Sequence, residues 1–209
     1  MKITRYPQSC LLLSHEGRQI VIDPGSDFLA TRQHTELDMV EAVLYTHKHS
    51  DHVDPEIADY LGSKGAQLIG NRETAEMLGD RELRIVEDGE SFEVAGFAVV
   101  ARELPHCLLP DGSAGPQNTG YIINGTFFHP GDGIELAGLE VESMALPIQG
   151  PDISMKDAFR FAKSLKVKQA IPIHYDKMGA DPAVFAAFAK RFEMPFTLHV
   201  LADGESLEL

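Results

Sequence analysis

Four side chains that can bind divalent metals lie within six positions of this chain. The run Thr46-His47-Lys48-His49-Ser50-Asp51-His52 has the form H-x-H-x-D-H. Imidazole and carboxylate groups are common ligands of zinc and related transition metals. A solvated polar loop is the alternative interpretation, but it would not require so dense a cluster. We therefore predict that this segment holds metal.

The flanking elements position the motif. The apolar run Ala42–Tyr45 before it is short and typical of a buried strand. If extended backbone continues past this strand, the two histidines of the H-x-H part point the same way and can share one metal. The pair Asp54-Pro55 after the motif is typical of a helix N-cap and first turn. The Asp-His end of the motif therefore lies where the chain turns into a helix and can face a second metal.

Further candidate ligands follow other apolar runs, where the ends of strands commonly place functional groups. They are Asp23 after Ile20–Ile22, His106 after Phe97–Leu104 and Pro105, Asp132 after Tyr121–Phe128, and His174 after Ala170–Ile173.

The order of these residues resembles that of the metallo-β-lactamase-fold hydrolase superfamily, and no position of the pattern is missing between Asp23 and His174. The resemblance implies an α/β fold, an αββα sandwich of two similar halves with the metals at the C-terminal edge of the strands. It also implies two divalent ions and assigns their ligands. The first ion takes His47, His49 and His106, the second takes Asp51, His52 and His174, Asp132 bridges them, and Asp23 supports the site from behind.

Several details refine this resemblance. The short length, the His-Ser-Asp-His sequence and the Pro-Ile-His-Tyr segment are most similar to the compact branch that contains ascorbate-phosphate lactonase. Redox di-iron members carry Glu at the position of His49, which disfavours oxygen or nitric oxide reduction here. The best-known β-lactamases use a Cys ligand and are exported, whereas Asp132 fills the bridging position here. Long RNA-processing members carry an additional domain, so we expect one domain over residues 1–209.

Composition fits a compact enzyme acting on small molecules. The formal charge of −14 and the pI near 5.0 leave no basic footprint for a nucleic acid. Nothing approaches a membrane span, and residues 1–7 do not resemble a signal peptide. Cys10 and Cys107 do not form a disulfide framework, so we expect two reduced thiols in a cytoplasmic protein. The oligomeric state cannot be read from these features.

Apolar patterning and turn residues predict the elements that carry the site. Strands are expected at 11–13, 19–22, 42–45, 67–69, 92–94, 97–104, 121–123 and 126–129, and helices at 55–61, 72–78, 158–165 and 183–192. Asp88–Val94 and Asp203–Leu209 repeat a D-G-E-S pattern before alternating apolar residues. This echo fits two similar halves, although a D-G turn before a strand is also common hairpin chemistry.

The implied mechanism is hydrolysis by a hydroxide shared between two metals. Histidine-rich sites favour zinc (Zn²⁺), with Mn²⁺ or Fe²⁺ as alternatives. We expect a small ester, lactone or related acyl substrate. A small-molecule phosphodiesterase is the alternative, and a non-catalytic metal-binding module is the third hypothesis. Tyr175, Lys177 and His129 are candidates for substrate contact, and a solvated loop or a structural role is the alternative for each.

Overall fold

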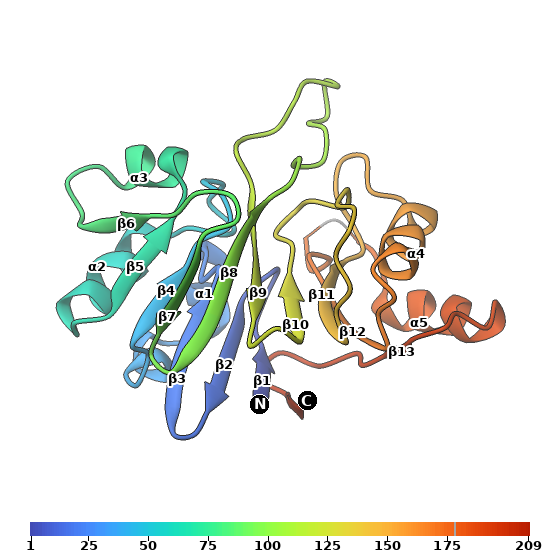
Figure 1. Ribbon diagram of the computed structural model, residues 1–209, viewed down its shortest axis with the longest axis horizontal. Coiled ribbons are helices and arrows are strands. Elements are labelled where there is room, and N and C mark those ends of the chain that lie inside the picture. Colours follow the sequence, from blue (N-terminus) through green and yellow to red (C-terminus); the bar gives the residue numbers. More distant parts are fainter. Residues whose placement is uncertain (178) are drawn as a thin grey trace.

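Two β-sheets lie face to face, and helices cover the outer side of each sheet (Figure 1). The computed structural model describes residues 1–177 and 179–209. Helices α1, α2 and α3 belong to the half that holds the first sheet, and α4 and α5 to the other half. This arrangement confirms the αββα sandwich that the family resemblance implies.

Each sheet has seven strands. The first has the order β14 (Ser206–Glu208), β1 (Lys2–Arg5), β2 (Leu11–His15), β3 (Arg18–Ile22), β4 (Ala42–Leu44), β5 (Gln67–Gly70) and β6 (Leu83–Ile85). The second has the order β7 (Ser91–Val94), β8 (Phe97–Glu103), β9 (Thr119–Ile123), β10 (Phe127–His129), β11 (Ser143–Pro147), β12 (Gln169–Ile173) and β13 (Thr197–Leu198). The helices are α1 (Ser26–Thr31), α2 (Pro55–Ser63), α3 (Arg72–Leu78), α4 (Met155–Ser164) and α5 (Pro182–Arg191), with a 3₁₀ turn at His34–Leu37.

The two sheets repeat one topology. Along each order above, the first three pairs of neighbouring strands are antiparallel and the last three are parallel. β14 and β7 occupy matching edge positions, and each follows a turn with a positive-φ glycine, Gly204 or Gly89. These two segments share the D-G-E-S pattern, so the repeated sequence occupies equivalent positions in the two halves.

Three apolar clusters hold the layers together. The central cluster joins the sheets and contains Leu44 and Ile69 from the first with Phe97 and Phe127 from the second, all fully buried. A second cluster packs the first sheet against α1 and α2, and a third packs the second sheet against α4 and α5. Burial on both faces explains why β4 and β12 read as continuous apolar runs rather than as alternating ones.

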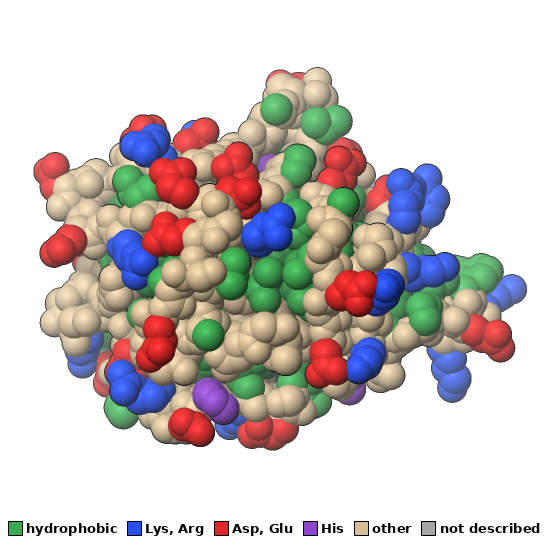
Figure 2. Space-filling model, viewed as in Figure 1, with side chains coloured by type: hydrophobic (Ala, Val, Ile, Leu, Met, Phe, Trp, Pro, Cys, Tyr) green, Lys and Arg blue, Asp and Glu red, His purple; other side chains and the backbone are tan. Residues whose placement is uncertain are grey.

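Capping residues explain why the predicted helices begin where they do. Asp54 accepts hydrogen bonds from the backbone N–H groups of Glu56 and Ile57, at 2.8 and 3.2 Å. Ser154 and Asp157 form a reciprocal capping box at the start of α4, and Asp181 caps α5. Within the described residues, no helix has the length and apolar character that a bilayer crossing requires. Acidic and basic side chains are interspersed over the face drawn in Figure 2.

Candidate metal centre

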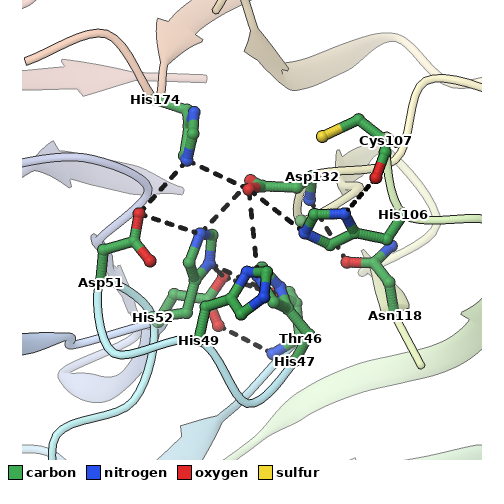
Figure 3. A network of polar contacts seen from close by, with 12 residues as sticks. Thr46, His47, His49, Asp51, His52, His106, Cys107, Asn118, Asp132 and His174 are labelled. Atoms are coloured by element: carbon green, nitrogen blue, oxygen red, sulfur yellow. Dashed lines mark hydrogen bonds and ion pairs between the residues drawn. The ribbon is translucent and has the colours of Figure 1, made fainter. Parts of the chain in front are cut away.

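The H-x-H-x-D-H motif occupies the loop between β4 and α2 (Figure 3). The strand ends at Leu44, so the prediction that it extends to Tyr45 is wrong by one residue, and a loop carries the histidines. Within this loop the backbone N–H groups of His52 and Val53 both donate to the carbonyl of His49, at 2.9 Å. This turn folds the end of the motif back on its start, and the rings of His47 and His52 have centroids 3.9 Å apart.

Gly25 makes room for this loop beside the strand-end Asp23. A Cβ atom added to Gly25 would lie 2.1 Å from the backbone carbonyl carbon of Asp51, which no side chain permits. The neighbouring Ser26 N–H donates to the carbonyl of Ser50 at 2.8 Å. The loop that carries the motif is therefore packed directly against the end of β3.

A first group of candidate ligands contains His47, His49, His106 and Asp132. One potential ligand atom from each lies within 4.8 Å of all the others. His47 Nε2 and His49 Nδ1 are 3.1 Å apart, and His106 Nε2 lies 3.6 Å from Asp132 Oδ2. His106 and Asp132 follow β8 and β10 of the second sheet, so this group spans both halves of the molecule.

A second group contains Asp51, His52 and His174, again within 4.8 Å of one another. His174 Nε2 lies 3.3 Å from Asp51 Oδ2, and His52 Nε2 lies 3.9 Å from the same oxygen. His174 follows the C-terminal end of β12. The group therefore also draws on both halves.

Asp132 lies between the two groups. Its Oδ2 is 3.0 Å from His174 Nε2 in the second group and 3.9 Å from His47 Nε2 in the first. Its Oδ1 is 3.3 Å from His52 Nε2. Asp132, the residue that the resemblance assigns as a bridge, thus faces candidate ligand atoms of both groups.

Hydrogen bonds on the far side of the rings fix their orientation. His52 Nδ1 donates to Asp23 Oδ2 at 2.7 Å, His106 Nδ1 to the carbonyl of Cys107 at 2.6 Å, and His174 Nδ1 to the carbonyl of Gln149 at 2.7 Å. These partners can only accept, so each Nδ1 carries the proton and each Nε2 turns toward the centre. Asp23 also accepts from the N–H and the hydroxyl of Thr46, both at 2.7 Å. Its place behind His52 is the one that the family pattern implies.

Unsatisfied polar atoms show that the centre fits a cation. His52 Nε2, His106 Nε2 and Asp132 Oδ1 are buried and have no hydrogen-bond partner among residues 1–177 and 179–209. Buried polar atoms rarely stay unpaired, because leaving water without a partner costs free energy. Imidazole nitrogens together with carboxylate oxygens are a donor set that suits zinc, manganese or iron. Divalent ions in the two groups would satisfy all three atoms.

The charges in the centre also fit a bound cation. Burial opposes ionisation of Asp132, but His174 and His52 hold the pKa of its carboxyl well below the usual range. Burial also disfavours a charged His174, but Asp132 outweighs it and raises the pKa of His174 to about 10. Burial, and then the charge of His52, lower the pKa of His47 well below its usual value. Protons therefore balance the Asp132 charge when no metal is bound, and metal binding would displace them.

The three candidates for substrate contact have other polar partners in the structure. His129 is fully buried, with Nε2 donating to the carbonyl of Ser9 at 2.9 Å and Nδ1 accepting from the N–H of Gly131. The hydroxyl of Tyr175 is directed at the carbonyl of Leu201, 3.4 Å away. Within the described residues these contacts engage both ring nitrogens of His129 and the hydroxyl of Tyr175, and a contact of either residue with substrate stays a prediction. The exposed Lys177 pairs with Asp27 at 2.8 Å, and its contact with substrate stays a prediction.

Sequence reasoning missed two polar residues at the centre. Asn118 donates to the carbonyl of Pro130 at 2.9 Å and accepts from the N–H of Asp132 at 3.3 Å, which fixes the Asp132 loop. Gln8 donates to Asp51 Oδ2 at 3.2 Å. Both are buried polar residues far from the ligand motifs in sequence, and no local pattern marks them.

Comparison with known proteins identifies the family of this chain. The model of the family described as the beta-lactamase superfamily domain matches residues 2–174. Protein Rv0786c of Mycobacterium tuberculosis is 27% identical over 83% of this chain and 84% of its own length. A UPF0173 metal-dependent hydrolase of Anoxybacillus flavithermus is 28% identical over the full length of both chains. The structure of Igni18, a metallo hydrolase from Ignicoccus hospitalis, superposes with a TM-score of 0.76 at 20% identity, covering 100% of this chain and 98% of that one. The family model spans most of the chain, and the sandwich agrees with it, so this chain belongs to the beta-lactamase superfamily and has the metallo-β-lactamase fold.

Proposed function

We propose that this chain is a binuclear metal-dependent hydrolase that cleaves a small ester, lactone or related acyl compound. The observation that carries the proposal is the shared carboxylate of Asp132, which lies within 3.9 Å of ligand atoms in both groups. The name of the Anoxybacillus relative, a metal-dependent hydrolase, supports the reaction class. Placement in the branch of ascorbate-phosphate lactonase stays a prediction.

In this proposal His47, His49 and His106 hold one ion, and Asp51, His52 and His174 hold the other. Asp132 contacts both, and we favour Zn²⁺ because five of the seven groups are imidazoles. Cations bound here would supply Lewis acidity and would lower the pKa of water in the site. The residues of the chain supply placement. Asp23 holds His52 and Thr46, Asn118 holds the Asp132 loop, and burial of these groups limits bulk water around the centre.

The acyl substrate is favoured by charge. An uncharged ester or lactone approaches a chain with a formal charge of −14 without the long-range repulsion that an anionic phosphodiester meets. Both ligand groups draw on both sheets, so we also propose that residues 1–209 act as one domain.

A substrate screen tests the proposal. Protein loaded with Zn²⁺ or Mn²⁺ is assayed against lactones, aryl esters and bis-aryl phosphodiesters, with chelator-treated protein and Asp132→Ala as controls. We expect metal-dependent turnover of the first two classes. Turnover of phosphodiesters alone would support the phosphodiesterase alternative. Two bound metals with no turnover in any class would favour a metal-binding module.

A further inference from the structure

A tight turn near the N-terminus contacts two candidate ligands of the second group, one from each half of the molecule. Residues 6–10 connect β1 to β2, and the turn is closed by the N–H of Tyr6 donating to the carbonyl of Cys10 at 2.8 Å. Gln8, inside the turn, is 2% exposed and has a φ of 57°. A side-chain-bearing residue rarely adopts this left-handed conformation unless its surroundings hold it there. The contacts of Gln8 show what holds it.

The backbone of Gln8 is joined to the segment that carries His174. The carbonyl of Gln8 accepts from the N–H of His174 at 3.0 Å, and the N–H of Gln8 donates to Asp176 Oδ2 at 2.7 Å. His174 itself has a φ of 59°. The turn and the loop after β12 therefore hold each other in strained conformations, and His174 is the candidate ligand at their junction.

The side chain of Gln8 is joined to the other half. Its Oε1 accepts from the N–H of Asp176 at 3.0 Å, which fixes the orientation of the amide. Its Nε2 then donates to Asp51 Oδ2 at 3.2 Å. This oxygen is the one that lies 3.3 Å from His174 Nε2. One residue thus links Asp51 from the first half to His174 from the second.

The hydrogen bond from Gln8 matters more for the orientation of Asp51 than any single contact does for His52 or His174. Its side chain is 22% exposed, against 0% for His52 and 3% for His174. His52 is also held by Asp23, and His174 by the carbonyl of Gln149. Within the described residues, the amide of Gln8 is the hydrogen-bond donor that meets the Asp51 carboxylate from outside the two ligand groups.

We propose that Gln8 is a positioning residue for the second metal group. It does not bind the ion. Its amide aims Asp51 at the ion and its backbone fixes His174, so the metal affinity of this group, and not that of the first, depends on Gln8. The inference rests on the ligand set of the proposed function.

The variant Gln8→Met tests the side-chain part of this role. It keeps the length of the side chain and both backbone contacts, and it removes only the amide. Metal-free protein is titrated with Co²⁺, followed by calorimetry and by the visible absorption of the bound ion. The matched control is Gln117→Met, because the amide of Gln117 also donates to a carboxylate, Glu103 at 3.3 Å, outside the ligand groups. His174→Ala provides the spectrum of a protein that lacks the second group.

We expect wild-type protein and Gln117→Met to bind two equivalents. In Gln8→Met the second equivalent should bind about 10- to 100-fold more weakly, with the first Kd unchanged. The absorption missing from Gln8→Met should match the absorption missing from His174→Ala. Two equivalents with wild-type affinities in Gln8→Met, or equal weakening of both, would overturn the inference and leave the ligand set standing. Fewer than two equivalents in wild-type protein would overturn both.

Discussion

Asp132 carries the largest predicted effect of any single side chain. Its carboxylate faces both groups of candidate ligands, with His174 Nε2 at 3.0 Å and His52 Nε2 at 3.3 Å. We expect Asp132→Ala to lose hydrolytic activity and to weaken both metals by more than the roughly 10- to 100-fold that loss of a supporting residue costs. Metal titration with elemental analysis measures this directly.

His174→Ala is the matched comparison, because His174 belongs to one group only. This variant should bind about one equivalent of metal, with the affinity of the first group retained. If His174→Ala lost both metals equally, the division into two groups would be wrong. If Asp132→Ala kept one site at full affinity, Asp132 would not be shared.

Cys10 gives a prediction that depends on pH. Burial, followed by the charge of Asp23, raises the pKa of the Cys10 thiol well above its usual value. The reactive thiolate is therefore scarce in the folded protein at pH 8, where an exposed thiol would be partly ionised. We expect iodoacetamide to leave Cys10 unmodified at pH 8 until denaturant is added. Cys10→Ala should keep substantial activity, since no thiol acts as a nucleophile in the proposed reaction. Fast alkylation of folded protein at pH 8 would contradict the first expectation.

At this scale, the sequence predicted the residues whose chemistry is rare and missed those whose role depends on contact. Histidines and carboxylates that follow apolar runs can be recognised as candidate ligands from residue type and position alone. The structure brings all seven predicted ligands together. Gln8 and Asp51 are 43 positions apart, and a glutamine has no chemistry that marks it in advance. His129 also shows the effect of contact, because its position beside the Pro-Gly-Asp loop suggested substrate contact, and the fold gives both of its ring nitrogens hydrogen-bond partners that no local pattern predicts.

Among the elements, the loop after β3 determines how closely the loop that carries the H-x-H-x-D-H motif can pack against the end of β3. Gly25 has no room for a Cβ, which would lie 2.1 Å from the backbone of Asp51. We expect Gly25→Ala to lower the free energy of unfolding by about 1–3 kcal/mol, because overpacking forces the backbone to move. Thermal unfolding should show a Tm lower by roughly 2–4 °C per kcal/mol, and displacement of Asp51 should weaken the second metal group.

Gly62→Ala is the control for this substitution. Gly62 lies in α2, and no atom of the described residues comes within 4 Å of an added Cβ, so alanine should raise stability by about 0.4–1 kcal/mol. Equal Tm values for the two variants would contradict this prediction, because they would show that the backbone accommodates the Cβ at Gly25 without a loss of stability.

The accuracy of the predicted elements follows from local signals. Helix α3 was predicted with its observed bounds, and α2, α4 and α5 were within three residues at each end, because Asp, Ser and Pro mark their starts. Helix α1 was missed. It has six residues, begins after Gly25 without a side-chain cap, and buries only Phe28. Strand β1 was missed because its sequence Lys-Ile-Thr-Arg lacks apolar alternation, and its pairing with β14 joins residues about 200 positions apart.

At the scale of the molecule, the two halves meet at the candidate metal centre. Each group combines residues of the β4–α2 loop with residues that follow strands of the second sheet. The apolar cluster between the sheets holds the halves together below the centre. Bound metal would therefore act as a cross-link between the halves, in addition to any role in catalysis.

This cross-link predicts that metal removal lowers the stability of the whole molecule. An ion that binds the folded chain and not the unfolded chain adds about 2.7 kcal/mol per site when its free concentration is about 100 times its Kd. We expect calorimetry to show a Tm roughly 5–10 °C lower per emptied site in chelator-treated protein, restored by added Zn²⁺. Asp132→Ala should have a Tm that responds little to metal, which separates binding at this centre from adventitious binding. A wild-type Tm that does not depend on metal would show that the ions, if bound, do not hold the halves together.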